Sequence, residues 1–149
     1  MNNNDFTTTL FVDNSPEETF NKINNVRNWW TENVEGSSEK LDDEFTVRFS
    51  DVHVSTQKLV EVIKNKKVVW LVTNSKLNFI KKKDEWTNTT ISFEIAAKEG
   101  KTQIIFKHIG LVPQIECYND CTKGWEQYIN GSLLKLLTEG KGVPDLTVG

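Results

Sequence analysis

Apolar residues recur along the last third of the chain with the period of an α-helix. A strand ends at His108, a Gly-Leu-Val-Pro connection follows, and an amphipathic pattern then runs to Thr138. One face of that pattern contains Tyr118, Trp125, Ile129, Leu133 and Leu136, and the opposite face contains Glu116, Asp120, Lys123, Gln127 and Asn130. Gly140 suits the position just after a helix, and Pro144 lies beyond it. The pattern predicts a long helix that must pack on another apolar surface.

Upstream of this helix, apolar and polar residues alternate with the period of two that is typical of β-strands. The alternation predicts strands over residues 6–12, 45–49, 91–95 and 102–108, a less regular strand over 53–63 and a short strand over 77–80. Residues 68–73 are apolar on both faces, which suits a central strand. Polar segments separate them, with a loop expected over 33–43 and a charged loop over 81–85. Successive strands joined by short turns indicate an antiparallel meander.

Two short helical segments are expected between the first and second strands. Ser15 can cap a helix that begins at Pro16 and buries Phe20 and Ile23. A second short turn is expected to hold Val26, Trp29 and Trp30. The whole order predicts an α+β fold, in which a strongly curved antiparallel sheet of six or seven strands wraps around the C-terminal helix. Such curvature tends to leave a cavity between sheet and helix.

Composition restricts the class of protein. The chain has 149 residues, of which 37% are hydrophobic, and a net charge of −3, as expected for one globular domain over 1–149, with loose tails at 1–4 and 141–149. Its interspersed charges favour neither a nucleic-acid nor a membrane partner. The N-terminus lacks the features of a signal peptide, and no apolar run reaches about 18 residues, so a cytoplasmic location is expected.

Particular residues spread over nearly the whole chain add a family resemblance. They are Ser15-Pro16, Phe20, Trp29-Trp30, Val69-Trp70, Glu85-Trp86, Thr89, Phe93-Glu94-Ile95, Thr102, His108, Gly110-Leu111, Pro113, Glu116-Cys117-Tyr118, Cys121, Gly124-Trp125 and Ser132-Leu133. In this order they resemble the SRPBCC superfamily, which includes START lipid-transfer domains and plant pollen-allergen proteins. The match is closer to its AHSA branch, named after an activator of a heat-shock chaperone ATPase. The resemblance implies a helix-grip fold and the binding of apolar small molecules, with enzymes among some members.

The aromatic residues are the main candidates for a ligand site. Five tryptophans and eight phenylalanines are many for this length. Core packing is the commoner explanation for any single one, but as a set they exceed what packing needs, so some should face a cavity. The predicted ligand-binding residues are Trp30, Phe49, Trp70, Phe93, Phe106, His108, Trp125 and Ile129.

His108 is the predicted polar point of that cavity. It shares a strand face with Ile104 and Phe106, so it could bind a polar group of a ligand or act as an acid or base near neutral pH. The alternative is a structural histidine that closes the strand and bonds the following turn. That alternative is the commoner case, because the sequence places no second catalytic group beside His108.

The two cysteines, Cys117 and Cys121, are four residues apart on the predicted helix. Their Cβ atoms would then lie about 6 Å apart, whereas a disulfide needs about 3.8 Å, so both are expected to be reduced thiols. With His108 they suggest a three-ligand metal site, but no fourth ligand is indicated, so we expect no metal and no other cofactor. Cys117, Gly124 and Gly131 lie along one edge of the helix, where small residues permit close packing or leave room for a ligand.

Three functions are consistent with these observations. The first is a binding module for a small apolar or amphipathic ligand between sheet and helix. The second is an enzyme that uses the same cavity, with His108 and Tyr128 as acid or base. The third is a protein-interaction module of the chaperone-cofactor type, with a chaperone or another protein as partner and a monomeric or homodimeric state. An open cavity favours the first two, and a filled core with an exposed apolar patch favours the third.

Overall fold

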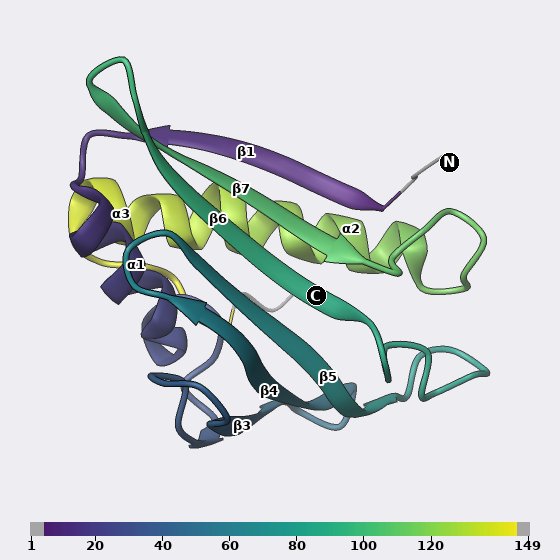
Figure 1. Cartoon of the computed structure of the whole chain (residues 1–149). Coiled ribbons are helices and arrows are strands. Elements are labelled where there is room, and N and C mark those ends of the chain that lie inside the picture. The colour runs from purple at the N-terminus through teal and green to yellow at the C-terminus, as the bar shows by residue number, and fades with distance from the viewer. Residues whose placement is uncertain (1–4, 146–149) are drawn as a thin grey trace.

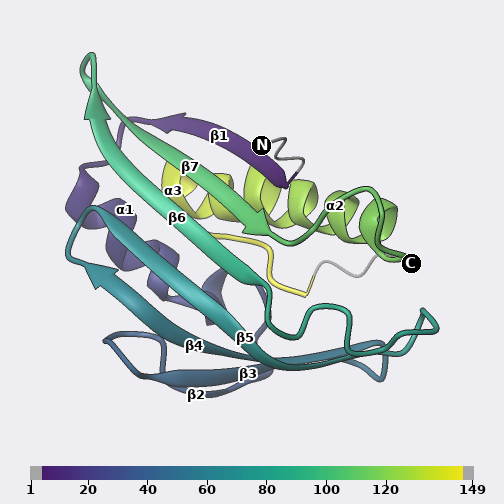
Figure 2. The ribbon, with the colours of Figure 1, turned by 45° about the vertical axis from the view of Figure 1, so that its right-hand side comes forward.

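A single antiparallel sheet grips the C-terminal helix (Figure 1). The computed structural model describes residues 5–145. The strands are β1 (Phe6–Val12), β2 (Val34–Gly36), β3 (Glu44–Phe49), β4 (His53–Ile63), β5 (Lys67–Leu77), β6 (Thr90–Lys98) and β7 (Lys101–Ile109). They pair in the order β1-β7-β6-β5-β4-β3-β2, so β1 and β2 form the two edges of the sheet (Figure 2). This confirms the predicted curved sheet, and irregular pairing at two points between β4 and β5 adds to its twist.

The helices cover the concave face of the sheet. Helix α1 (Pro16–Asn24) and a 3₁₀ turn (Val26–Asn28) follow β1, as predicted. The long helix consists of α2 (Tyr118–Gln127), a π-helical segment (Tyr128–Leu133) and α3 (Leu134–Glu139). Its predicted apolar face is confirmed at four positions that are at most 3% exposed: Trp125, Ile129, Leu133 and Leu136. No helix in the described part of the chain is long and apolar enough to cross a membrane.

Local sequence signals set the helix ends. Ser15 accepts a hydrogen bond from the Glu18 N–H at 3.1 Å, and Pro16 occupies the first turn of α1, where its missing N–H costs nothing. After α3, Gly140 adopts a φ of 85° and donates its N–H to the Leu136 carbonyl at 3.1 Å. Gly140 therefore ends the long helix in the left-handed conformation that glycine adopts without strain.

Two predicted boundaries were wrong. Residues 33–43 are not all loop, because β2 forms within them and pairs with β3. Gly36 permits this close pairing, since a Cβ there would collide with the Glu44 carbonyl oxygen. The short strand over 77–80 does not form either. Leu77 ends β5, and the chain then turns as the Asn78 N–H bonds the Val52 carbonyl at 2.8 Å.

The segment after Gly140 folds back onto the molecule. The Val143 N–H donates to Ser132 Oγ at 2.7 Å, and the Asp145 N–H donates to the Trp30 carbonyl at 2.9 Å. The Asp145 carboxylate accepts bonds from the Thr31 hydroxyl and from the Glu32 N–H. Residues 141–145 thus differ from the loose tail that we expected, whereas residues 1–4 and 146–149 lie outside the described part.

Candidate functional site

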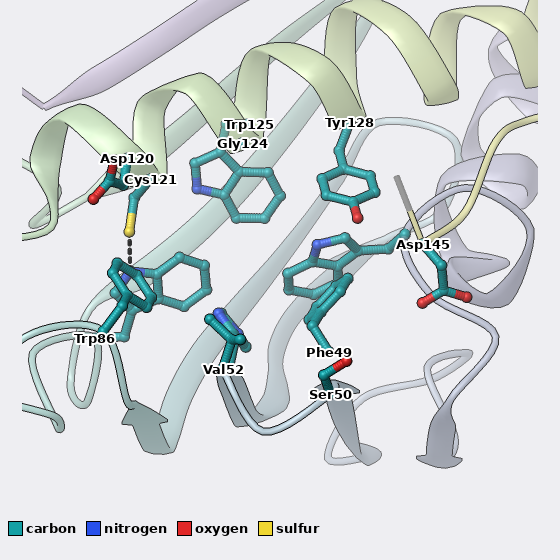
Figure 3. A pocket seen from close by; sticks show the side chains of 13 residues that line it. Phe49, Ser50, Val52, Trp86, Asp120, Cys121, Gly124, Trp125, Tyr128 and Asp145 are labelled. Atoms are coloured by element: carbon teal, nitrogen blue, oxygen red, sulfur yellow. Dashed lines mark hydrogen bonds between the residues drawn. The ribbon is translucent and has the colours of Figure 1, made fainter. Parts of the chain in front are cut away.

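One end of the interior contains a pocket of about 430 Å³ (Figure 3). It lies between the β3–β4 turn, the β5–β6 connection and the long helix. Its walls are formed by Trp30, Phe49, Ser50, Val52, His53, Phe79, Trp86, Asp120, Cys121, Gly124, Trp125, Tyr128 and Asp145. The two carboxylates among them, Asp120 and Asp145, are exposed, as is Ser50, so charge is confined to the rim. Val52 and Phe79 are 48% and 41% exposed, and they give this pocket an apolar entrance.

Aromatic rings make up most of the inner wall. The rings of Trp30 and Trp125 have centroids 5.1 Å apart, and those of Trp86 and Trp125 are stacked at 5.7 Å. The Phe49 ring contacts the rings of Trp30 and Tyr128, with centroid distances of 5.8 and 5.7 Å. Because these rings support one another, the wall is held rigidly and presents apolar surface to anything that enters.

His53, the first residue of β4, is the histidine of this wall. Its ring meets Trp86 edge to face with a centroid distance of 4.6 Å and Phe49 at 5.2 Å. Burial among these rings lowers the pKa of His53 to about 3, so the imidazole is neutral near pH 7. His53 Nε2 lies 2.8 Å from Ser55 Oγ, which also accepts a bond from Gln57 Nε2 at 2.6 Å. The His53 ring is therefore packed among aromatic rings and held in position by a hydrogen bond to Ser55.

His108 lies behind the pocket wall and not in it. It is fully buried, and burial first and the nearby His53 second lower the pKa of His108 to about 3. The Trp125 Nε1–H donates to His108 Nδ1 at 3.0 Å, so the ring proton resides on Nε2 and is donated to Thr89 Oγ1 at 2.8 Å. The Thr89 hydroxyl donates in turn to the Trp86 carbonyl at 2.6 Å. Both ring nitrogens are thus used inside the protein, as for a structural histidine, but their partners are Trp125 and Thr89 and not the following turn that we expected.

The other predicted site residues divide into two groups. Trp30, Phe49 and Trp125 border the pocket. Four others are 0% exposed and pack in the core: Trp70, Phe93, Phe106 and Ile129. Ring contacts join the two groups. The Phe106 ring packs against Trp125 and Phe93, with centroid distances of 4.7 and 5.1 Å. The sequence correctly marked the aromatic interior but could not separate its packed part from its hollow part.

Sequence reasoning missed His53 as a site residue. The available signal was the alternation of His53, Ser55 and Gln57 with outward residues on a strand that continues inward to Leu59. Three polar side chains on an inward face are unusual, since buried polar groups must find hydrogen-bond partners. The rim residues Val52 and Phe79 carried no comparable signal.

The cysteines are both free and buried, as predicted. Cys121 Sγ borders the pocket and accepts a bond from the Trp86 Nε1–H at 3.3 Å (Figure 3). Its hydrogen bond with Cys117, together with burial, raises the pKa of the Cys121 thiol well above its usual range, so it is a poor nucleophile. Within residues 5–145 no group of three or more His, Cys, Asp or Glu side chains is arranged to hold a metal ion.

Gly124 and Gly131 are not explained by close packing. A methyl group added at either position would have no atom within 4 Å apart from its own helix backbone and its chain neighbours. Gly124 borders the pocket, and a side chain there would point into or beside that space. At Gly124 the structure fits the alternative in which a small residue leaves room.

Comparisons with known proteins agree with this fold. The family model described as Activator of Hsp90 ATPase homolog 1-like protein matches residues 18–138. The structure of the Aha1 dimer from Colwellia psychrerythraea is similar with a TM-score of 0.75 and 23% identity, covering 93% of this chain and 98% of that one. Protein SSP2350 from Staphylococcus saprophyticus shares the fold with a TM-score of 0.69 and 16% identity, covering 95% of this chain and 99% of that one. Protein MLL2253 from Mesorhizobium loti does so with a TM-score of 0.69 and 15% identity, covering 93% of this chain and 100% of that one. No protein with a curated description matches the chain in sequence.

Proposed function

The chain belongs to the family of Activator of Hsp90 ATPase homolog 1-like proteins, and within that family we propose that it is a binding module for a small apolar or amphipathic ligand. The ligand would occupy the pocket beside Trp30, Trp86 and Trp125. The aromatic wall of this pocket is the observation that carries the proposal.

Size and surface support small-molecule binding. A volume of about 430 Å³ falls in the range of pockets that hold small ligands, roughly 300–1,000 Å³. Burial of apolar ligand surface against the rings supplies binding free energy of about 25 cal/mol per Å² before the costs of association are subtracted. Val52 and Phe79 at the entrance provide apolar surface for a ligand on its way in.

The chemistry of the walls favours binding over catalysis. His108 has both nitrogens bonded within the protein, and the pKa of His53, at about 3, makes it a weak base. The raised pKa of Cys121 keeps that side chain a thiol. General acid–base catalysis works best when the pKa of the catalytic group lies near the working pH, and neither histidine meets that condition.

A fluorescence titration with N-phenyl-1-naphthylamine, an uncharged apolar dye, tests the proposal. The parent protein should bind the dye with a Kd in the micromolar range, about −8 kcal/mol. Gly124→Leu should weaken binding by at least about tenfold, because the added side chain takes up pocket space.

Gly131→Leu is the matched control. Gly131 lies on the same helix, also has open space around its Cβ position, and does not border the pocket. Its dye affinity should equal that of the parent. A folded parent that binds neither this dye nor any of a panel of lipids and aromatic compounds would refute the binding-module proposal.

A further inference from the structure

The indole N–H groups around the pocket differ in whether they have an acceptor. The Trp86 N–H donates to Cys121 and the Trp125 N–H to His108. Among the described residues none accepts a bond from Trp30 Nε1, and this nitrogen is not buried, in contrast to Trp70 Nε1. Since the Trp30 ring borders the pocket, its N–H is a donor open to that space.

Hydrogen bonding inside β4 is the basis for assigning the ring proton of His53 to one nitrogen. Gln57 Nε2 can only donate, so Ser55 Oγ accepts that bond and has one proton of its own to give. Its other partner in the described structure is His53 Nε2, and we assign the Ser55 proton to this bond, because Ser55 Oγ then both accepts and donates. The proton of the neutral ring is then on Nδ1. No described residue bonds Nδ1, and this atom is not among the buried atoms without a partner.

The pocket thus offers two N–H donors on neighbouring rings, since the centroids of Trp30 and His53 are 6.3 Å apart. A donor without an acceptor costs roughly 1–3 kcal/mol when an apolar ligand takes it out of water, so a ligand with a matching acceptor is favoured. The donors define the polar end of the pocket and the tryptophan faces define its apolar body.

Charge excludes ionic ligands. The carboxylates that border the pocket, those of Asp120 and Asp145, lie at the exposed rim and repel an anion. Asp145 is already engaged by Thr31 and Glu32, and the Asp120 carboxylate lies in solvent at the rim, where water and salt screen its attraction for a cation. Deeper in, the pocket presents the positive ends of two N–H dipoles, which a cationic head group would meet unfavourably.

We propose that the pocket selects an uncharged ligand with a flat apolar body and one acceptor oxygen of the carbonyl class, which accepts from Trp30 Nε1–H and His53 Nδ1–H. This rests on the proposed function, because it specifies the ligand class for that pocket. The donors are fixed before the ligand arrives, Trp30 by ring packing against Trp125 and His53 by the bond to Ser55.

Matched ligands test the proposal. Calorimetry should compare 2-acetylnaphthalene with 2-ethylnaphthalene, which have similar shape and differ by the acceptor oxygen. The preference ratio is defined as Kd of the ethyl compound divided by Kd of the acetyl compound. It should fall by about three- to tenfold in Trp30→Phe and in His53→Phe, the range that one hydrogen bond accounts for.

Trp86→Phe is the control, because it removes an indole N–H that is already used by Cys121. Its affinity for both ligands should change together, so the preference ratio should stay at the parent value. Circular dichroism and thermal unfolding establish that each variant is folded.

A second measurement on the parent needs no variant. In a ¹H–¹⁵N spectrum the acetyl compound should shift the Trp30 indole N–H downfield by more than the ethyl compound does, whereas the two compounds should shift the indole N–H signals of Trp86 and Trp125 by similar amounts. Equal shifts for both compounds, with unchanged preference ratios in both variants, would overturn the carbonyl proposal but leave the binding module standing. Tighter binding of 2-naphthoate or of 2-(aminomethyl)naphthalene would overturn it too. If no naphthalene compound binds at all, the proposed function fails with it.

Discussion

Two histidines contact the same tryptophan and differ in how many of their hydrogen bonds are made inside the protein. His53 and His108 contact Trp86 edge to face, with centroid distances of 4.6 and 4.7 Å. Burial lowers the pKa of each to about 3. His108 uses both nitrogens within the protein, whereas the described residues bond His53 at Nε2. We refer to them as the closed and the open histidine.

The difference shows that a lowered pKa does not by itself identify a functional histidine. The bonds of the closed histidine join three separate parts of the chain: Trp125 on α2, His108 on β7 and Thr89 before β6. The open histidine bonds Ser55 within β4, and Ser55 in turn accepts a bond from Gln57 on the same strand. The closed network fixes the fold, and the open one leaves a polar atom for the pocket.

The largest expected effect tests what the two histidines share. An unfolded histidine titrates near 6.5, whereas both titrate near 3 in the folded chain, so between these values the unfolded state binds more protons. Stability from both groups is fully present above pH 6.5 and is lost as the pH falls toward 3. From pH 7 to pH 5 the free energy of unfolding should fall by up to about 2 kcal/mol per histidine.

Urea unfolding at half-unit pH steps measures this loss. Most exposed carboxylates remain ionised above pH 5, so the histidines dominate the window. In His53→Phe the loss between pH 7 and pH 5 should be half that of the parent. A parent whose stability is flat from pH 7 to pH 5 would show that the two rings protonate normally.

The same substitution at both positions tests what separates the histidines. His108→Phe should cost about 2–4 kcal/mol, because the Trp125 N–H and the Thr89 hydroxyl lose their partner inside the core. His53→Phe should cost about 1 kcal/mol or less, since Ser55 keeps Gln57 and the aromatic cage keeps an aromatic ring. Denaturant unfolding at pH 7.5 measures both. Equal costs would contradict the distinction between closed and open.

Glycine substitutions at two turns test the hydrogen-bond network of His108 through its partner Thr89. Gly110 has a φ of 104°, and a Cβ there would lie 2.7 Å from Thr89 Cγ2. Gly110→Ala should therefore cost about 2–3 kcal/mol, combining backbone strain with displacement of the residue that bonds His108. Gly100 has a φ of 84° and open space around its Cβ, so Gly100→Ala should cost about 1 kcal/mol from strain alone. Thermal unfolding of both variants gives the difference, and identical costs would show that Thr89 moves aside freely.

The sequence predicted the helices and strands better than the contacts between side chains that lie far apart in the chain. The helix face around Trp125 and Ile129 follows from a local period of 3.6, and the strands follow from a period of two, so the helix-grip architecture could be predicted. The contacts of His53 and His108 could not, because they depend on residues far along the chain. The contact of His53 with Trp86 depends on the positions of two separate segments, the start of β4 and the β5–β6 connection.

The irregular pairing of β4 with β5 was a further obstacle. Register shifts lie between Thr56 and Gln57 and between Leu59 and Glu61. Such bulges change which residues face inward, so a simple alternation does not fix the orientation of every side chain. The polar run from His53 to Gln57 therefore read as an irregular strand, although it carries the polar end of the pocket.

The smallest expected effect compares two glycines of the long helix, Gly124, which borders the pocket, and Gly131, which does not. Gly124→Ala and Gly131→Ala should each stabilise the protein by up to about 1 kcal/mol, because alanine has the higher helix propensity and open space surrounds both Cβ positions. The added methyl group at Gly124 borders the pocket, so dye affinity should fall about two- to threefold there and stay unchanged for Gly131→Ala. Thermal unfolding and dye titration on the same samples measure both quantities. A pair of variants with equal stability gains and equal dye affinities would mean that the space beside Gly124 is not where the ligand lies, and the open histidine would then lose its assigned role.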